Sequence, residues 1–334
     1  MSSERLEEPY SRHVPSVVWN GERVRAIWNT VHRRPLSETF HEFLTNVVMW
    51  TLGEDWWKHQ RAMPRGAQHV TMAWRDAFAQ ASRRPPLQTV TDQHGTRFAT
   101  TASGQAIALL SFGYDLFCLQ ATDRLPVFLV ERLRRNREFQ SVRYEIAAAA
   151  TMVRAGFQIR FLDDVESKAK HCEFVASCTT SGVRLAIEAK SRVRPGVLHN
   201  RGEFQYEGDH RGLLRLLRDA CRQSVEGLPL VIFIDVNVPP TPQTPPAEKL
   251  WVRDIGAAAD DIERRADEKG EGDPFALIVA TNFAFHFGDH QGLQAPVEFG
   301  VLPGRRPAVP IPDTTIVDRI TWGVAHYARI PAEI

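Results

Sequence analysis

Residues 183–190 read VRLAIEAK, and this stretch decides the fold of the second half of the chain. It follows a turn-forming glycine, and its apolar residues favour a strand. Residues two apart in a strand point to the same face, so Glu188 and Lys190 share a face with the small Ala186. The residues on the opposite face are Leu185, Ile187 and Ala189. The stretch therefore predicts a carboxylate and an amine side by side near the end of a strand.

The segments on either side of this strand alternate between helical and extended patterns. Apolar residues at helical spacing and a run of alanines predict a helix that ends at Gly156. The uninterrupted apolar run 228–238 is typical of a strand buried on both faces. In chain order we expect helix 139–155, strands 157–162, 173–177 and 183–189, helix 211–226, strand 228–238, helix 254–269 and strand 275–283. This order places the second half in the α/β class.

The first part of the chain has a pattern that predicts a mostly helical N-terminal region. Apolar residues recur at helical spacing over 22–81, and Thr39 with Glu42 three residues later fits a capping box that begins a helix. Further helices are expected over 104–120 and from Pro126 onward. The predicted regions are 1–135 and 136–334.

The composition is that of an ordinary globular protein. Apolar residues make up 43% of the chain, and the formal net charge is +1, so a nucleic-acid partner would have to meet a local basic patch. The four cysteines form no C-x-x-C pair, which removes support for a zinc ribbon or a redox motif. The apolar stretch 106–119 is too short and too polar for a membrane span. We therefore expect a cytoplasmic location and no membrane partner.

Four residues stand out for their chemistry and are called the tetrad below. Glu145 lies on the first helix of the second half, Glu173 enters the second strand, and Glu188 and Lys190 end the third strand. In the expected order helix, three strands, helix, strand, the chain carries an acid on the first helix, an acid on the second strand and acid-x-Lys on the third strand. This arrangement resembles the PD-(D/E)XK (restriction-endonuclease-like) nuclease superfamily. The resemblance covers roughly residues 139–240. It implies a mixed central sheet flanked by helices, with the α-β-β-β-α-β core of that superfamily.

The resemblance also implies a reaction and a metal. Glu145, Glu173 and Glu188 would be the ligands of Mg²⁺ or Mn²⁺, because clustered carboxylates suit hard cations. The metal would acidify a bound water and stabilise the developing charge, and Lys190 would act on the attacking water or on that charge. The expected activity is that of a metal-dependent endonuclease that hydrolyses DNA, in defence or repair.

The sequence departs from the superfamily pattern at the second strand. Cys172-Glu173 stands where Pro-Asp is expected, and Asp163 or Asp164 is an alternative source of a shorter carboxylate. His286 and His290 form a weaker alternative metal site in a segment that otherwise reads as a loop.

Several further residues are candidates for substrate contact. Gln223 matches a position where many members of the superfamily carry a glutamine near the site. Arginines on and before the helix 211–226 would hold a phosphate backbone or, equally, form a solvated face paired with acids. These arginines are Arg192, Arg194, Arg211, Arg215, Arg218 and Arg222.

Two classes of function remain open. The first is the metal-dependent nuclease, with the N-terminal region recognising substrate or a protein partner. The second is a catalytically inactive subunit of the same fold that binds nucleic acid or a protein. Taken alone, Glu188 and Lys190 also read as an ordinary ion pair on a strand, and Glu145 as an ordinary helix carboxylate. The sequence has no P-loop, G-x-S-x-G or H-E-x-x-H motif, so the corresponding hydrolase classes lose support.

Overall fold

The fold is taken from a computed structural model of the chain. It describes residues 16–27, 29–92, 95–121, 125–162, 172–194, 206–283 and 297–331. The first 135 positions contain β1 (Ser16–Trp19), β2 (Glu22–Ile27), β3 (Thr30–Pro35), α1 (Phe40–Leu52), α2 (Glu54–Ala62), a 3-10 turn (Arg65–Ala67), α3 (Val70–Ala81), β4 (Gln88–Asp92), β5 (Gly95–Ala99), α4 (Gly104–Ala121) and α5 (Val127–Leu133). The remainder contains α6 (Asn136–Arg154), β6 (Phe157–Phe161), β7 (Phe174–Cys178), β8 (Arg184–Ser191), α7 (His210–Cys221), β9 (Leu230–Asp235), a 3-10 turn (Pro246–Glu248), α8 (Leu250–Glu268), β10 (Leu277–Asn282), β11 (Glu298–Pro303) and α9 (Thr314–Ala325).

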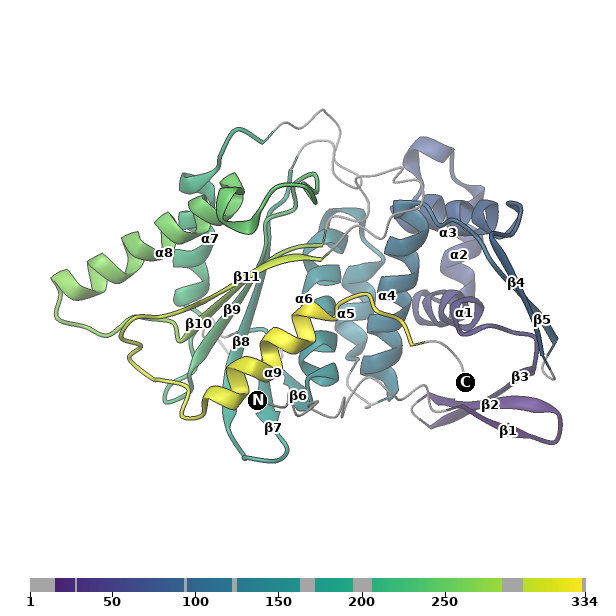
Figure 1. The fold of residues 1–334 in the computed structure, drawn as a ribbon, viewed down its shortest axis with the longest axis horizontal. Coiled ribbons are helices and arrows are strands. Elements are labelled where there is room, and N and C mark those ends of the chain that lie inside the picture. The colour runs from purple at the N-terminus through teal and green to yellow at the C-terminus, as the bar shows by residue number, and fades with distance from the viewer. Residues whose placement is uncertain are drawn as a thin grey trace, which may run out of the picture.

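A six-stranded mixed sheet organises the second half, which confirms the predicted α/β class. Its strand order is β11-β10-β9-β8-β7-β6. The neighbours β8, β9 and β10 run parallel, whereas β6, β7 and β11 each pair antiparallel. Helices α7 and α8 cover one face, and α6 and α9 cover the other (Figure 1). The predicted elements from α6 to β10 are therefore all present, with boundaries that differ by a few residues.

The two faces of β8 separate as its sequence predicts. Leu185, Ile187 and Ala189 pack in the larger core that also contains α6, whereas Ala186 packs in the smaller core under α7 and α8. Because alternate residues point to opposite faces, Glu188 and Lys190 lie on the side of Ala186.

β8 also extends beyond its neighbour β7. The pairs between β7 and β8 end at Phe174 and Ile187, whereas the pairs between β8 and β9 continue to Ser191 and Asp235. Within the described part of the chain, the end of β8 therefore has a strand neighbour on one side only. Near this end of β8, the charge of Glu145 from α6 acts on Glu188.

The N-terminal region contains helices α1–α5, but the helical prediction for residues 22–35 is wrong. Residues 16–19, 22–27 and 30–35 form the antiparallel sheet β1-β2-β3 instead. Asn20 and Gly21 have positive φ angles of 50° and 76° and make the tight turn between β1 and β2. Asn-Gly is the commonest sequence for such a turn, because both central residues need positive φ. A second hairpin, formed by β4 and β5, was also not expected.

The capping box predicted for the first long helix is present. The Glu42 backbone N–H donates to Thr39 Oγ1 at 3.2 Å, and the Thr39 backbone N–H donates to the Glu42 carboxyl at 2.8 Å. The reciprocal bonds satisfy donors that the first turn of a helix leaves without partners. They fix the beginning of α1.

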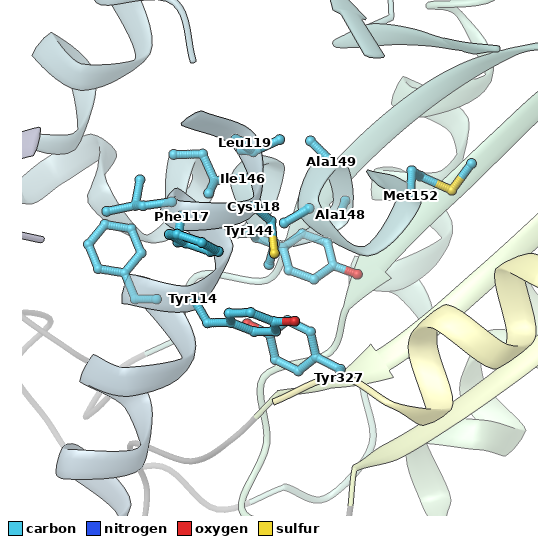
Figure 2. Close-up of a cluster of buried hydrophobic side chains, with 14 of the residues drawn as sticks. Tyr114, Phe117, Cys118, Leu119, Tyr144, Ile146, Ala148, Ala149, Met152 and Tyr327 are labelled. Atoms are coloured by element: carbon cyan, nitrogen blue, oxygen red, sulfur yellow. The ribbon is translucent and has the colours of Figure 1, made fainter. Parts of the chain in front are cut away.

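Helix α6 lies between the N-terminal helices and the sheet. Figure 2 shows side chains of α4, side chains of α6 and Tyr327 packed in one buried cluster. Close backbone approach tightens the packing, since a Cβ on Gly323 of α9 would lie 3.0 Å from the Thr151 carbonyl oxygen of α6. The hydrophobic core is therefore continuous from α1 to the residues that follow α9. No helix in the described ranges is long and apolar enough to cross a membrane.

Candidate functional site

Two members of the tetrad form an ion pair at the end of β8. The Lys190 amine contacts the Glu188 carboxyl, which is fully buried, while 21% of the Lys190 side chain remains exposed. Burial opposes the lysine charge, but the Glu188 carboxylate and then the other two glutamates raise the pKa of Lys190 above its ordinary value. The lysine therefore stays protonated and points its charge at the acids.

Glu145 is held by an arginine that the sequence reading missed. Arg132 Nη1 and Nη2 donate to the two Glu145 carboxyl oxygens, each at 2.9 Å. Arg132 belongs to α5, and its Nε also donates to Glu138 at 3.3 Å. A two-pronged contact of this kind fixes the orientation of the carboxylate as well as its charge. Arg132 belongs to a different helix from Glu145, so no spacing in the sequence signals the contact.

Glu173 lies beside both pairs. Its backbone N–H donates to the Glu188 carboxyl. Burial, and then the charges of Glu145 and Glu188, raise the pKa of Glu173 well above the usual range, although Lys190 and Arg132 oppose this. The tetrad and Arg132 therefore share one electrostatic environment near the end of β8.

The tetrad holds more acids than bases. Among the described residues, the three carboxyls share their electrostatic interactions with Lys190 and Arg132. Burial is the main cause that raises the pKa of Glu188 to about 7, and the Glu145 charge adds to it. Ionised carboxylates in such a place are costly unless a further cation or a proton compensates them. Within the part of the site that the structure describes, a further cation or a proton would therefore be favoured.

The acids do not yet surround a single point. Among the described residues, no three His, Cys, Asp or Glu side chains are gathered in a group that would hold a metal ion. Arg132 and Lys190 engage Glu145 and Glu188, respectively. A metal bound here would therefore have to displace or share these ionic contacts.

The predicted arginines have two different environments. Arg192 and Arg194 both contact Asp209, at 2.6 Å and 3.1 Å, and Arg194 also lies over the ring of Tyr206. Arg222 contacts Asp219 at 3.1 Å. On α7, Arg211 and Arg215 are exposed and Arg218 is half-buried. The first pair contributes to the structure around α7, while the exposed helical arginines remain candidates for phosphate contact.

The structure gives little information on the remaining residues that the sequence singled out. Gln223 follows α7, and its backbone N–H donates to the Ala220 carbonyl, so its place near the tetrad stays a prediction. The remaining candidates, Asp163, Asp164, His286 and His290, lie outside the described residues.

A second buried polar group lies near the end of β9, and sequence reasoning did not single it out. Asp235 is completely buried, and Arg143 Nη2 lies 3.5 Å from its Oδ2. Burial raises the pKa of Asp235 to about 6. The sequence contains this acid within the apolar run 228–238. Nothing in the sequence indicates that Arg143 faces it.

Comparisons with known proteins add no relative. No family model, curated protein or solved structure matches this chain.

Proposed function

We propose that this protein is a metal-dependent nuclease whose site is the tetrad, in a fold that resembles the PD-(D/E)XK superfamily. The observation that carries the proposal is the mutual effect of the acids: Glu145 and Glu188 raise the pKa of Glu173, and Glu145 raises that of Glu188, even with the Lys190 and Arg132 charges nearby. A divalent cation would supply the missing charge. Its bound water would become the nucleophile that attacks a phosphodiester.

The neighbouring groups suit the same chemistry. Lys190 has an exposed fraction large enough to meet a substrate, and its charge is maintained by Glu188. An ammonium group in that position stabilises negative charge as it develops on the phosphoryl group. The exposed arginines of α7 would hold the flanking phosphates, and their contribution should weaken with salt. DNA is the proposed substrate, a cytoplasmic location is assumed, and defence or repair is the proposed context.

A catalytically inactive subunit is the second candidate. The observation that favours it is the engagement of Glu145 by Arg132 and of Glu188 by Lys190. If these contacts persist with nucleic acid present, the acids serve the fold and no metal binds. The protein would then bind nucleic acid or a protein partner without cutting.

Calorimetric titration with Mg²⁺ and Mn²⁺, paired with cleavage of single-stranded and duplex DNA and RNA, separates the two. We expect one divalent ion to bind and to support cleavage, and both to be lost in Glu188→Gln. Glu268→Gln is the matched control, because Glu268 is an exposed carboxylate at the end of α8. A native protein that binds no divalent ion in the presence of nucleic acid would establish the inactive subunit.

A further inference from the structure

A large cleft lies beside α5. Its volume is about 770 Å³, and it is formed by β3, α1, α5 and the edge strand β6. Cavities of this size accommodate ligands of the dimensions of a nucleotide. Neither the tetrad nor Arg132 lines it among the described residues.

One wall of the cleft is an aromatic platform. His32 and Trp50 stack with ring centres 4.4 Å apart and an angle of 15° between their planes. Phe43 supports Trp50 from its edge at 5.7 Å, yet 44% of Trp50 remains exposed. Burial, followed by the nearby Arg34 charge, lowers the pKa of His32, so the platform is uncharged at neutral pH. Flat uncharged aromatic rings at a cleft are suited to stack on another flat ring.

Two guanidinium groups add positive charge at the same cleft. Arg134 is held by a 2.9 Å bond from its Nε to the Leu52 carbonyl. Gly53 permits this position, because a Cβ there would lie 2.9 Å from Arg134 Nη2. Arg160, on β6, is exposed. Neither arginine has a carboxylate partner within the described residues, and Glu131 is the one acid among the described lining residues.

The cleft is connected to the tetrad by two short structural links. Glu131 and Arg134 line the cleft while Arg132, on the same segment, grips Glu145. Helix α5 and the residue that follows it thus contribute both to the cleft and to the environment of Glu145. Phe161, at the end of β6, lines the cleft and pairs with Phe174, next to Glu173. The elements that line the cleft therefore also contact members of the tetrad or pair with the strand next to them.

We propose that the cleft binds an unpaired nucleobase of the nucleic-acid strand, stacked on the His32–Trp50 platform, with the adjoining phosphate at Arg134 and Arg160. The choice of ligand rests on the proposed nuclease function. Aromatic stacking beside basic side chains is the combination by which proteins hold single strands without reading their sequence. Gln120, held by a 2.7 Å bond to Thr51 Oγ1, offers amide groups to the edge of the base. The cleft would thus favour substrates with single-stranded ends, flaps or gaps.

The test is binding of a dye-labelled single-stranded oligonucleotide in EDTA, so that no cleavage occurs. Trp50→Leu should weaken binding roughly five- to a hundredfold, the usual range for loss of one base–aromatic stack. Trp50→Phe keeps a ring and should retain most of the affinity. The matched control is Trp19→Leu, because Trp19 is 61% exposed and lies on β1 away from the cleft. The melting temperature of each variant verifies folding.

The salt dependence of binding tests the proposed phosphate contact separately. Arg160→Ala should reduce the dependence of log K on log salt by about 0.7, the value for one single-strand phosphate contact. Arg184→Ala, another exposed arginine on the same sheet, should leave it unchanged.

The proposed base-binding role of the cleft is overturned if Trp50→Leu and Trp19→Leu bind the oligonucleotide with equal affinity. It is also overturned if the native protein binds a blunt duplex as tightly as a single strand. If oligonucleotide binding depends on Trp50 but no metal-supported cleavage is found, the proposed base-binding cleft is supported and the proposed nuclease activity is rejected. If Trp50→Leu leaves cleavage unchanged, the nuclease activity is supported and the base-binding cleft is rejected.

Discussion

Two buried ionic clusters in this molecule use the same kinds of group in different proportions. Between α4, α6 and the residues after α9, Asp115 accepts a 2.8 Å bond from Arg154 and another from the Tyr327 hydroxyl. Arg154 also lies over the rings of Tyr114 and Tyr327. One carboxylate thus accepts bonds from one guanidinium and one hydroxyl, and the charge of Arg143 also favours its ionised form. In the tetrad, three carboxyls meet Lys190 and Arg132.

The source of the pKa shifts separates the two clusters. Burial raises the pKa of Asp115, whereas Arg154, the hydrogen bond from Tyr327 and Arg143 all oppose that rise. Burial also raises the pKa of Glu173, but there two further acids add to the rise. A balanced buried pair is typical of structure, whereas acids that raise one another's pKa are typical of a site awaiting a charged ligand. The comparison therefore predicts that removing one acid has opposite consequences in the two places.

The largest effect is expected in the balanced cluster. Asp115→Asn leaves Arg154 buried without a counter-charge, which should lower the free energy of unfolding by about 3 to 5 kcal/mol. Denaturant titration measures the loss. Asp219→Asn is the control, because Asp219 and Arg222 form an exposed pair whose loss should cost under about 1 kcal/mol. Similar small losses in both variants would contradict the comparison.

The next effect concerns catalysis in the unbalanced cluster. Lys190→Ala should leave the divalent ion bound but slow phosphodiester cleavage by roughly 100- to 1,000-fold, because one electrostatic contact to the transition state is lost. Glu188→Ala should instead lose the metal. Single-turnover rates and calorimetry on the same preparations distinguish these outcomes. Full activity without the amine would remove Lys190 from the mechanism.

The pH dependence of stability tests the excess of acid directly. Glu188 has a pKa of about 7 when folded against about 4.3 in an unfolded chain. The folded state therefore binds more protons between these values, so this group's stabilisation is present below pH 4 and is lost as pH rises through 7. In EDTA, the native protein should lose about 3 to 4 kcal/mol across that window relative to Glu188→Gln. Parallel stability curves for the two proteins would disprove the shift.

The smallest effect concerns Arg132, which competes with a metal for Glu145. Arg132→Met should raise Mg²⁺ affinity by roughly tenfold, about 1.4 kcal/mol, because a nearby positive charge is removed. Arg135→Met is the control, since the Arg135 side chain is exposed and pairs with Glu138. An affinity that falls in Arg132→Met would show that the arginine positions Glu145 for the metal.

The sequence predicts the second half better than the first for a physical reason. From α6 to β10, helices and strands alternate with long apolar stripes, and each element buries the face that its pattern indicates. In β2 the buried positions alternate, but two of them are Arg23 and Arg25. Arg25 is buried against Phe43 and pairs with Glu38. Buried arginines are invisible to a search for apolar spacing, so the strand reads as a helix.

The candidate site shows the same limit. Strand alternation places Glu188 and Lys190 together, since both lie on one element. Arg132 reaches Glu145 from another helix through tertiary packing, and no local pattern encodes that. The three acids were found from their elements and their order, while the charges that compensate them needed the folded chain.

The position of α6 has a consequence for cooperativity. One part of this helix packs on the N-terminal helices, where the Phe139 ring meets the rings of His69 and Phe112. Another part is tied to the sheet, where the Tyr144 hydroxyl is 2.8 Å from Thr281 Oγ1. Loss of either neighbour would leave an apolar side of α6 facing water, at a cost set by the area exposed. Heat should therefore melt both regions in one transition, and a fragment cut at residue 135 should precipitate instead of folding as an autonomous unit.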